Sequence, residues 1–141
     1  MKTNTFYKVT CHKKSWLYLM GTGLGDYILS FKVGKKTVPK IGGIFVFDNP
    51  VSVVDFLRSK FSKDVSVFVG KGTNPVAIKV MSGYITREHI ASFWAVRKSK
   101  KKLSNGIHQL YPVEKGVVIV DSFTPKKEYS FFEFVNEFGE I

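Results

Sequence analysis

Apolar residues along this chain recur mostly in short runs or in alternation with polar residues, a pattern typical of β-strands. Turn-forming residues separate these runs. The pattern predicts strands over Phe6–Cys11, Trp16–Met20, Tyr27–Val33, Val65–Val69 and Pro75–Met81. Two further runs, Ile44–Phe47 and Val117–Val120, are wholly apolar, which favours positions at the centre of a sheet.

Helical spacing is clearest after the first of these apolar runs. A helix is predicted to begin at Pro50, with Asp48 or Asn49 as its cap. Its apolar side repeats at helical spacing through Val53, Val54, Leu57 and Phe61.

Two more segments carry helical spacing. Thr86 can cap a helix whose stripe contains Ile90, Phe93, Trp94 and Arg97, although a strand over Ser92–Val96 is an alternative. Near the end of the chain, Phe131, Val135 and Phe138 also fall on one helical face. We therefore predict a single α+β domain over residues 1–141, with a mainly antiparallel sheet, one or two helices and a Phe-rich C-terminal segment.

Glycines mark the expected connections between strands. Gly21–Asp26 reads GTGLGD, which lacks the spacing of a dinucleotide-binding fingerprint and precedes a predicted strand rather than a helix. Gly70–Asn74 is predicted to be a loop between two strands, and Asp121–Pro125 is expected to end the late apolar strand.

Composition narrows the class of protein. Apolar residues make up 44% of the 141 residues and aromatic residues 15%, which suits one folded domain. The single cysteine, Cys11, excludes a disulfide framework and a multi-cysteine zinc site. We see neither a signal peptide nor an apolar run long enough for a membrane span, so no membrane association and a cytoplasmic location are expected.

Charge is the most pronounced property of the composition. The net charge is +11, carried by many Lys and only three Arg, and such a field attracts nucleotides and nucleic acid. Residues 128–141 instead carry four Glu and no basic residue, so this acidic tail is expected to dock on the basic body or on a neighbouring chain. The Phe-rich tail would expose much apolar surface if undocked, which also makes a homo-oligomer plausible.

No catalytic motif is recognisable. The three histidines lack the spacing of a helical metal site, and no nucleophile elbow or phosphate loop is present. The carboxylates of the body are scattered singly near turns and caps. We therefore expect a protein that is not an enzyme and that needs no cofactor or metal.

Candidate ligand-binding residues come from two basic segments. Lys71, Thr73 and Asn74 combine a cation with small polar groups, although the same residues also suit a plain hairpin connection. The run that contains Arg97, Lys98, Lys100 and Lys101 could clamp phosphates or could be a solvated loop. Trp94 and Tyr84 are candidates for stacking on a base.

Lysines also occur in pairs at other expected turns. These pairs are Lys13–Lys14, Lys35–Lys36 and Lys126–Lys127. If the turns gather at one end of the sheet, they form a basic rim.

Three segments together resemble small accessory proteins of tailed bacteriophages. They are Tyr27–Gly34 (YILSFKVG), Gly42–Asp48 (GGIFVFD) and Pro112–Pro125 (PVEKGVVIVDSFTP). The resemblance implies a phage-type protein, of a kind that often antagonises host defence, and some viral antagonists bind immune nucleotide messengers without cutting them. The leading hypothesis is therefore sequestration of an anionic nucleotide, and the alternatives are a nucleic-acid-binding module and an inhibitor that binds a host protein.

Overall fold

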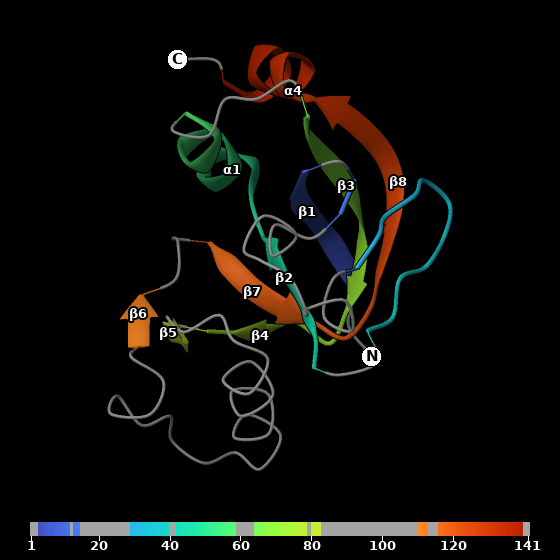
Figure 1. Cartoon of the computed structure of the whole chain (residues 1–141), viewed down its shortest axis with the longest axis vertical. Helices are drawn as coiled ribbons and strands as arrows, with labels where there is room; N and C mark the ends of the chain where they lie inside the picture. Colours follow the sequence, from blue (N-terminus) through green and yellow to red (C-terminus); the bar gives the residue numbers. More distant parts are fainter. Residues whose placement is uncertain are drawn as a thin grey trace.

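The computed structural model describes residues 3–11, 13–14, 29–39, 42–58, 64–78, 80–82, 110–112 and 116–139 (Figure 1). These residues form a six-stranded sheet with the strand order β4-β7-β2-β1-β3-β8. Its strands are β1 (Thr3–Cys11), β2 (Ile44–Phe47), β3 (Val65–Thr73), β4 (Val76–Ala77), β7 (Val117–Val120) and β8 (Phe123–Ser130). A small second sheet pairs β5 (Val80–Ser82) with β6 (Leu110–Pro112).

The α+β prediction is confirmed. The described helices are α1 (Pro50–Leu57) and α4 (Phe131–Phe138), and the strands pair mainly antiparallel. The longest pairing, between β1 and β3, runs without interruption from Thr3↔Thr73 to Cys11↔Val65. The two wholly apolar runs are β2 and β7, and both have a partner strand on each side, as predicted.

Local signals explain where the helices begin. The Asn49 side chain accepts a hydrogen bond of 2.8 Å from the backbone N–H of Ser52, and Pro50 occupies the first helical position, where no backbone donor is needed. At α4, Ser130 and Glu133 form a capping box, in which each side chain accepts from the backbone N–H of the other residue. The predicted helix cap and the predicted helical tail are both confirmed.

The sheet has an apolar core on each face. On one face α1 and α4 cover strand residues, and the buried cluster includes Val9, Val53, Leu57, Val67 and Phe134. On the other face the cluster consists of Phe6, Phe31, Ile44, Val46, Phe68, Val120 and Phe123. Residues that alternate along β1 and β3 therefore enter two different cores.

Four sequence predictions differ from the structure. The predicted strand Pro75–Met81 is instead two strands, β4 and β5, which belong to different sheets. Gly70–Thr73 continues β3 instead of forming a loop. Gly70 and Gly72 lack a Cβ atom, so atoms of the neighbouring strands can approach them closely. Within the predicted strand Tyr27–Val33, the described part forms only isolated bridges at Ser30 and Lys32. A whole strand, β8, begins at Phe123 and was missed, because its central residues, TPKKE, lack apolar alternation.

Several predicted elements lie outside the described residues. These are the strand Trp16–Met20, the Gly21–Asp26 connection, and the helix after Thr86 with its alternative strand Ser92–Val96.

Candidate anion-binding edge

A strap of residues 29–39 lies along the start of β8. The Gly34 N–H donates to the Pro125 carbonyl at 2.8 Å, and Thr37 and Phe123 exchange two backbone hydrogen bonds of 2.8 and 3.0 Å. The Phe31 ring anchors the strap in the core, 6.1 Å from the Phe123 ring and 6.2 Å from the Phe68 ring. The strap is thus fixed to the sheet from both its backbone and its buried side chain.

A tight turn in the strap presents three lysines to solvent. The Lys35 N–H donates to the Lys32 carbonyl at 3.0 Å, and Gly34 has a φ of +86°, which glycine adopts without strain. Lys32, Lys35 and Lys36 are all exposed.

Two more lysines stand in an irregularity of β8. Val69 of β3 pairs with Lys127, whereas the next residue, Gly70, pairs with Pro125. Lys126 is therefore the extra residue of a β-bulge. Lys126 and Lys127 are both exposed at the edge strand of the sheet.

Lys71 belongs to the neighbouring strand. It is paired with Thr5 of β1 on one side and with Thr124 of β8 on the other. Its ammonium group donates to the Thr5 hydroxyl at 3.1 Å and is otherwise exposed. Lys71 therefore lies one strand inward from the bulge.

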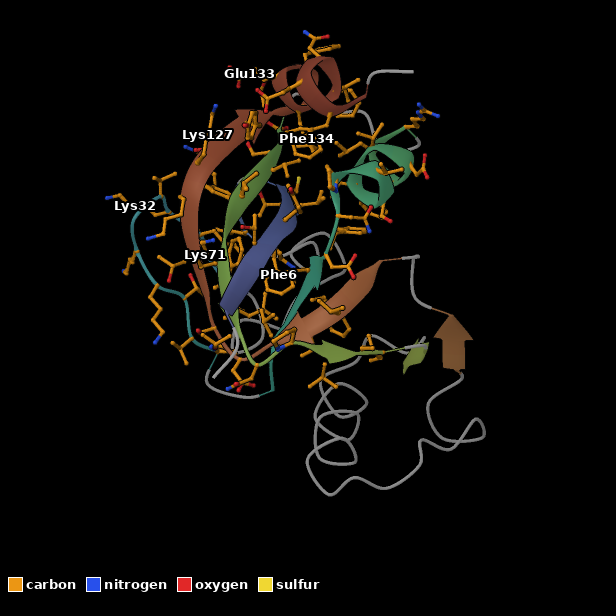
Figure 2. All side chains as sticks on the ribbon, turned by 180° about the vertical axis from the view of Figure 1, so that it is seen from behind. Phe6, Lys32, Lys71, Lys127, Glu133 and Phe134 are labelled. Atoms are coloured by element: carbon orange, nitrogen blue, oxygen red, sulfur yellow. The ribbon has the colours of Figure 1, made fainter. Side chains whose placement is uncertain are left out.

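We call these six residues the basic edge: Lys32, Lys35, Lys36, Lys71, Lys126 and Lys127. They come from three adjacent segments, namely the strap, β8 and β3. Since neighbouring strands lie about 4.8 Å apart, the three backbones fall within roughly 10 Å of one another. Figure 2 shows Lys32, Lys71 and Lys127 on the same side of the molecule.

The acidic tail docks on the basic body and reaches one member of the basic edge. The Lys127 ammonium lies 4.6 Å from the centre of the Tyr129 ring. A hydrogen bond to Tyr129 raises the pKa of Lys127, and the charges of Glu137 and Glu133 on α4 add to this effect. The Tyr129 hydroxyl in turn donates to Glu137 at 2.7 Å.

For the other five lysines of the basic edge, no contact of this kind is found with the residues that the structure describes. Two ion pairs among the described residues, Lys13–Glu128 at 3.6 Å and Arg58–Asp55 at 3.9 Å, do not involve the edge. Within the described part of the chain, neither of these ion pairs neutralises the five ammonium groups.

The lysine pairs were expected at turns, but Lys126–Lys127 lies inside strand β8. Lys35–Lys36 and Lys126–Lys127 lie on adjacent segments. The Lys13–Lys14 turn adjoins the strap, because the Phe31 N–H donates to the Lys13 carbonyl at 2.9 Å. The third pair nevertheless differs from the others, since Lys13 faces Glu128.

The predicted ligand residues divide into three groups. Lys71 belongs to the basic edge, whereas Thr73 and Asn74 lie at a corner where their side chains bond to Ser122 and to the Asp121 carboxylate, each at 2.8 Å. Because these two side chains hold the β7–β8 turn and one of them faces a carboxylate, we do not include them in the edge. The remaining residues, Tyr84, Trp94, Arg97, Lys98, Lys100 and Lys101, lie outside the described residues.

Sequence analysis missed one unusual lysine. Lys8 is only 8% exposed, and its ammonium donates to the Phe45 carbonyl at 2.8 Å and lies 5.7 Å from the centre of the Phe31 ring. Burial lowers the pKa of Lys8 to about 8. The sequence held one indication of this burial. Lys8 lies on the same face of β1 as Phe6 and Thr10, and both of these residues are buried.

Other kinds of site find no support in the described ranges. No three His, Cys, Asp or Glu side chains there are grouped as metal ligands would be. Neither described helix has the length and apolar character to cross a bilayer. Comparisons with protein families, with curated proteins and with solved structures found no match.

Proposed function

We propose that this protein binds an anionic nucleotide ligand at the basic edge and sequesters it without chemical change. The observation that carries the proposal is the convergence of six exposed lysines from the strap, β8 and β3, none of which belongs to either ion pair found among the described residues. Lysine ammonium groups attract phosphates as point charges.

Sequestration requires only binding. A protein that holds a messenger tightly and in sufficient amount lowers its free concentration below what the receptor needs. The resemblance of three segments to bacteriophage accessory proteins favours this role, in which the ligand would be an immune nucleotide messenger. The ligand is then recovered intact when the protein is denatured.

The test combines binding with recovery. Isothermal titration calorimetry with ATP, ADP-ribose, cyclic dinucleotides and short oligonucleotides should show binding by at least one of them at micromolar protein. After incubation and heating, mass spectrometry should return that ligand unaltered. Absence of heat with every nucleotide contradicts the binding, and a changed product contradicts the non-enzymatic role.

A matched pair of variants locates the binding. Lys126→Gln removes one exposed charge from the basic edge, and Arg58→Gln removes one exposed charge from the end of α1. Lys126→Gln should weaken binding several-fold, whereas Arg58→Gln should leave it nearly unchanged. Equal weakening would point to a general field effect rather than to a site.

A further inference from the structure

The lysines of the basic edge are all exposed, which distinguishes this surface from a pocket for a small molecule. Small-ligand sites are concave and bury most of the ligand surface. Here the charges stand on an edge strand, on the adjoining strap and on the next strand inward. Such a surface gains affinity by contacting several phosphates at once rather than by enclosing one.

The strap adds an apolar component to this surface. Val33 and Val38 flank Lys35 and Lys36, and they are 45% and 60% exposed. In a single-stranded nucleic acid the bases are unpaired, so they can turn out of the strand and their faces can contact side chains beside the phosphates. A duplex keeps its bases stacked inside and offers mainly its phosphates.

We propose that the ligand of the basic edge is a short single-stranded oligonucleotide, whose phosphates contact lysines of the strap, β8 and β3 and whose bases contact Val33 and Val38. This inference rests on the proposed function and narrows its ligand class. Because the edge contains lysines and no arginine, the strand is bound with little preference for base sequence.

Salt dependence supplies a quantitative expectation. For single strands the logarithm of the binding constant falls with the logarithm of salt concentration by about 0.7 per neutralised phosphate. Contacts from all six lysines give a slope of about −4, and contacts from the five other than Lys127 give about −3.5.

The experiment uses the full chain and fluorescently labelled oligothymidylates of two, four, eight and twelve nucleotides. Fluorescence anisotropy at several salt concentrations should show affinity that rises with length until the edge is filled, with a slope of −3 to −4 for the longer strands. A cyclic dinucleotide and a duplex of equal length should compete at least tenfold more weakly than the eight-nucleotide strand.

Variants connect the slope to the residues. The triple variant Lys35→Gln, Lys36→Gln and Lys126→Gln should reduce the magnitude of the slope by about 2, since three contacts are lost. Arg58→Gln should leave the slope unchanged. All four side chains are exposed, so the variants are expected to fold, and circular dichroism is the check on this.

The outcomes separate the two proposals. If the cyclic dinucleotide binds as tightly as the longer strands, or the triple variant keeps the full slope, the oligonucleotide inference is wrong while nucleotide binding stands. Equal competition by duplex overturns the single-strand preference. If no nucleotide of any length binds, both proposals are wrong.

Discussion

At the scale of single residues, Lys8 is the position where local pattern and environment conflict most. Phe6, Lys8 and Thr10 alternate along β1 and are buried, and Phe6 belongs to the core that contains Phe31 and Phe68. The Lys8 ammonium has one described acceptor, the Phe45 carbonyl, and its pKa is lowered to about 8 by burial. A charged lysine here therefore costs stability at neutral pH.

We predict that Lys8→Met stabilises the protein most at pH 7 and progressively less toward pH 10. Between pH 8 and 10.5 the unfolded chain keeps a proton on Lys8 that the folded chain has released, so the free energy of unfolding of the unmodified protein rises with pH. The full rise attributable to Lys8 is roughly 3 kcal/mol.

Urea unfolding of both proteins at pH 7 and pH 10 measures this difference. Tyrosine and cysteine ionisation contributes equally to the two proteins and cancels in the comparison. A stability difference that does not change with pH would contradict the assignment of Lys8 as a buried, perturbed amine.

At the scale of secondary-structure elements, the glycines of β3 explain why a predicted loop is a strand. A Cβ atom at Gly70 would meet the Thr124 carbonyl oxygen and would lie 2.8 Å from the Pro125 Cα atom, both of which are backbone groups of β8. At Gly72 it would lie 2.9 Å from the Phe6 ring and 3.0 Å from a Val120 methyl group. Local propensity favours a turn here, but the close approach of two strands determines the structure.

We predict that Gly70→Ala destabilises the protein by about 2–3 kcal/mol and disturbs the bulge at Lys126, because backbone atoms of β8 must move. Gly72→Ala should cost less, since the side chains it meets can shift and alanine is otherwise preferred to glycine in a strand. Thermal unfolding of the two variants followed by circular dichroism gives the comparison. If Gly72→Ala destabilises the protein more than Gly70→Ala, the backbone of β8 can shift more easily than the core side chains around Phe6.

At the scale of the whole molecule, the C-terminal helix completes the core rather than forming a detachable tail. Phe134 is fully buried and its ring centre lies 5.5 Å from that of Tyr129 and 6.0 Å from that of Tyr7. Glu128–Ser130 belong to β8, so deleting residues 128–141 would remove part of the sheet together with α4. Such a deletion therefore cannot test whether the tail binds a partner.

We predict that Phe134→Ala lowers the free energy of unfolding by about 3–5 kcal/mol, because it leaves a large cavity between α4 and the sheet. Phe132→Ala, at a side chain 60% exposed on the same helix, should cost only about 1 kcal/mol, because what it loses is the contact of its ring with Phe131 and a partly buried surface. Chemical denaturation of both variants measures the contrast. Similar losses at the two positions would mean that α4 is not docked as described.

The sequence was sufficient for those features that depend on local pattern. The wholly apolar runs, the cap at Asn49 and the helical tail were all predicted from a few neighbouring residues. Strand β8 and the basic edge were harder, because TPKKE has no apolar alternation and the edge forms only when a strap, a bulge and a glycine-containing strand pair with one another. The pairs of adjacent lysines in the sequence indicated candidate binding residues. Which of these lysines lie close together depends on pairing between segments that are distant in the sequence.

The bulge at Lys126 also bears on how copies of this protein behave toward one another. An exposed edge strand can pair with a strand of another molecule, and β-bulges and charged side chains on the edge oppose such pairing. The strap already pairs with the edge strand β8 at Phe123 and Pro125. Beyond Pro125, the charges of Lys126 and Lys127 repel the same edge of another copy. A bound polyanion that neutralises these two lysines would lower the repulsion between copies. Protein saturated with an oligonucleotide should therefore aggregate more readily than protein without ligand.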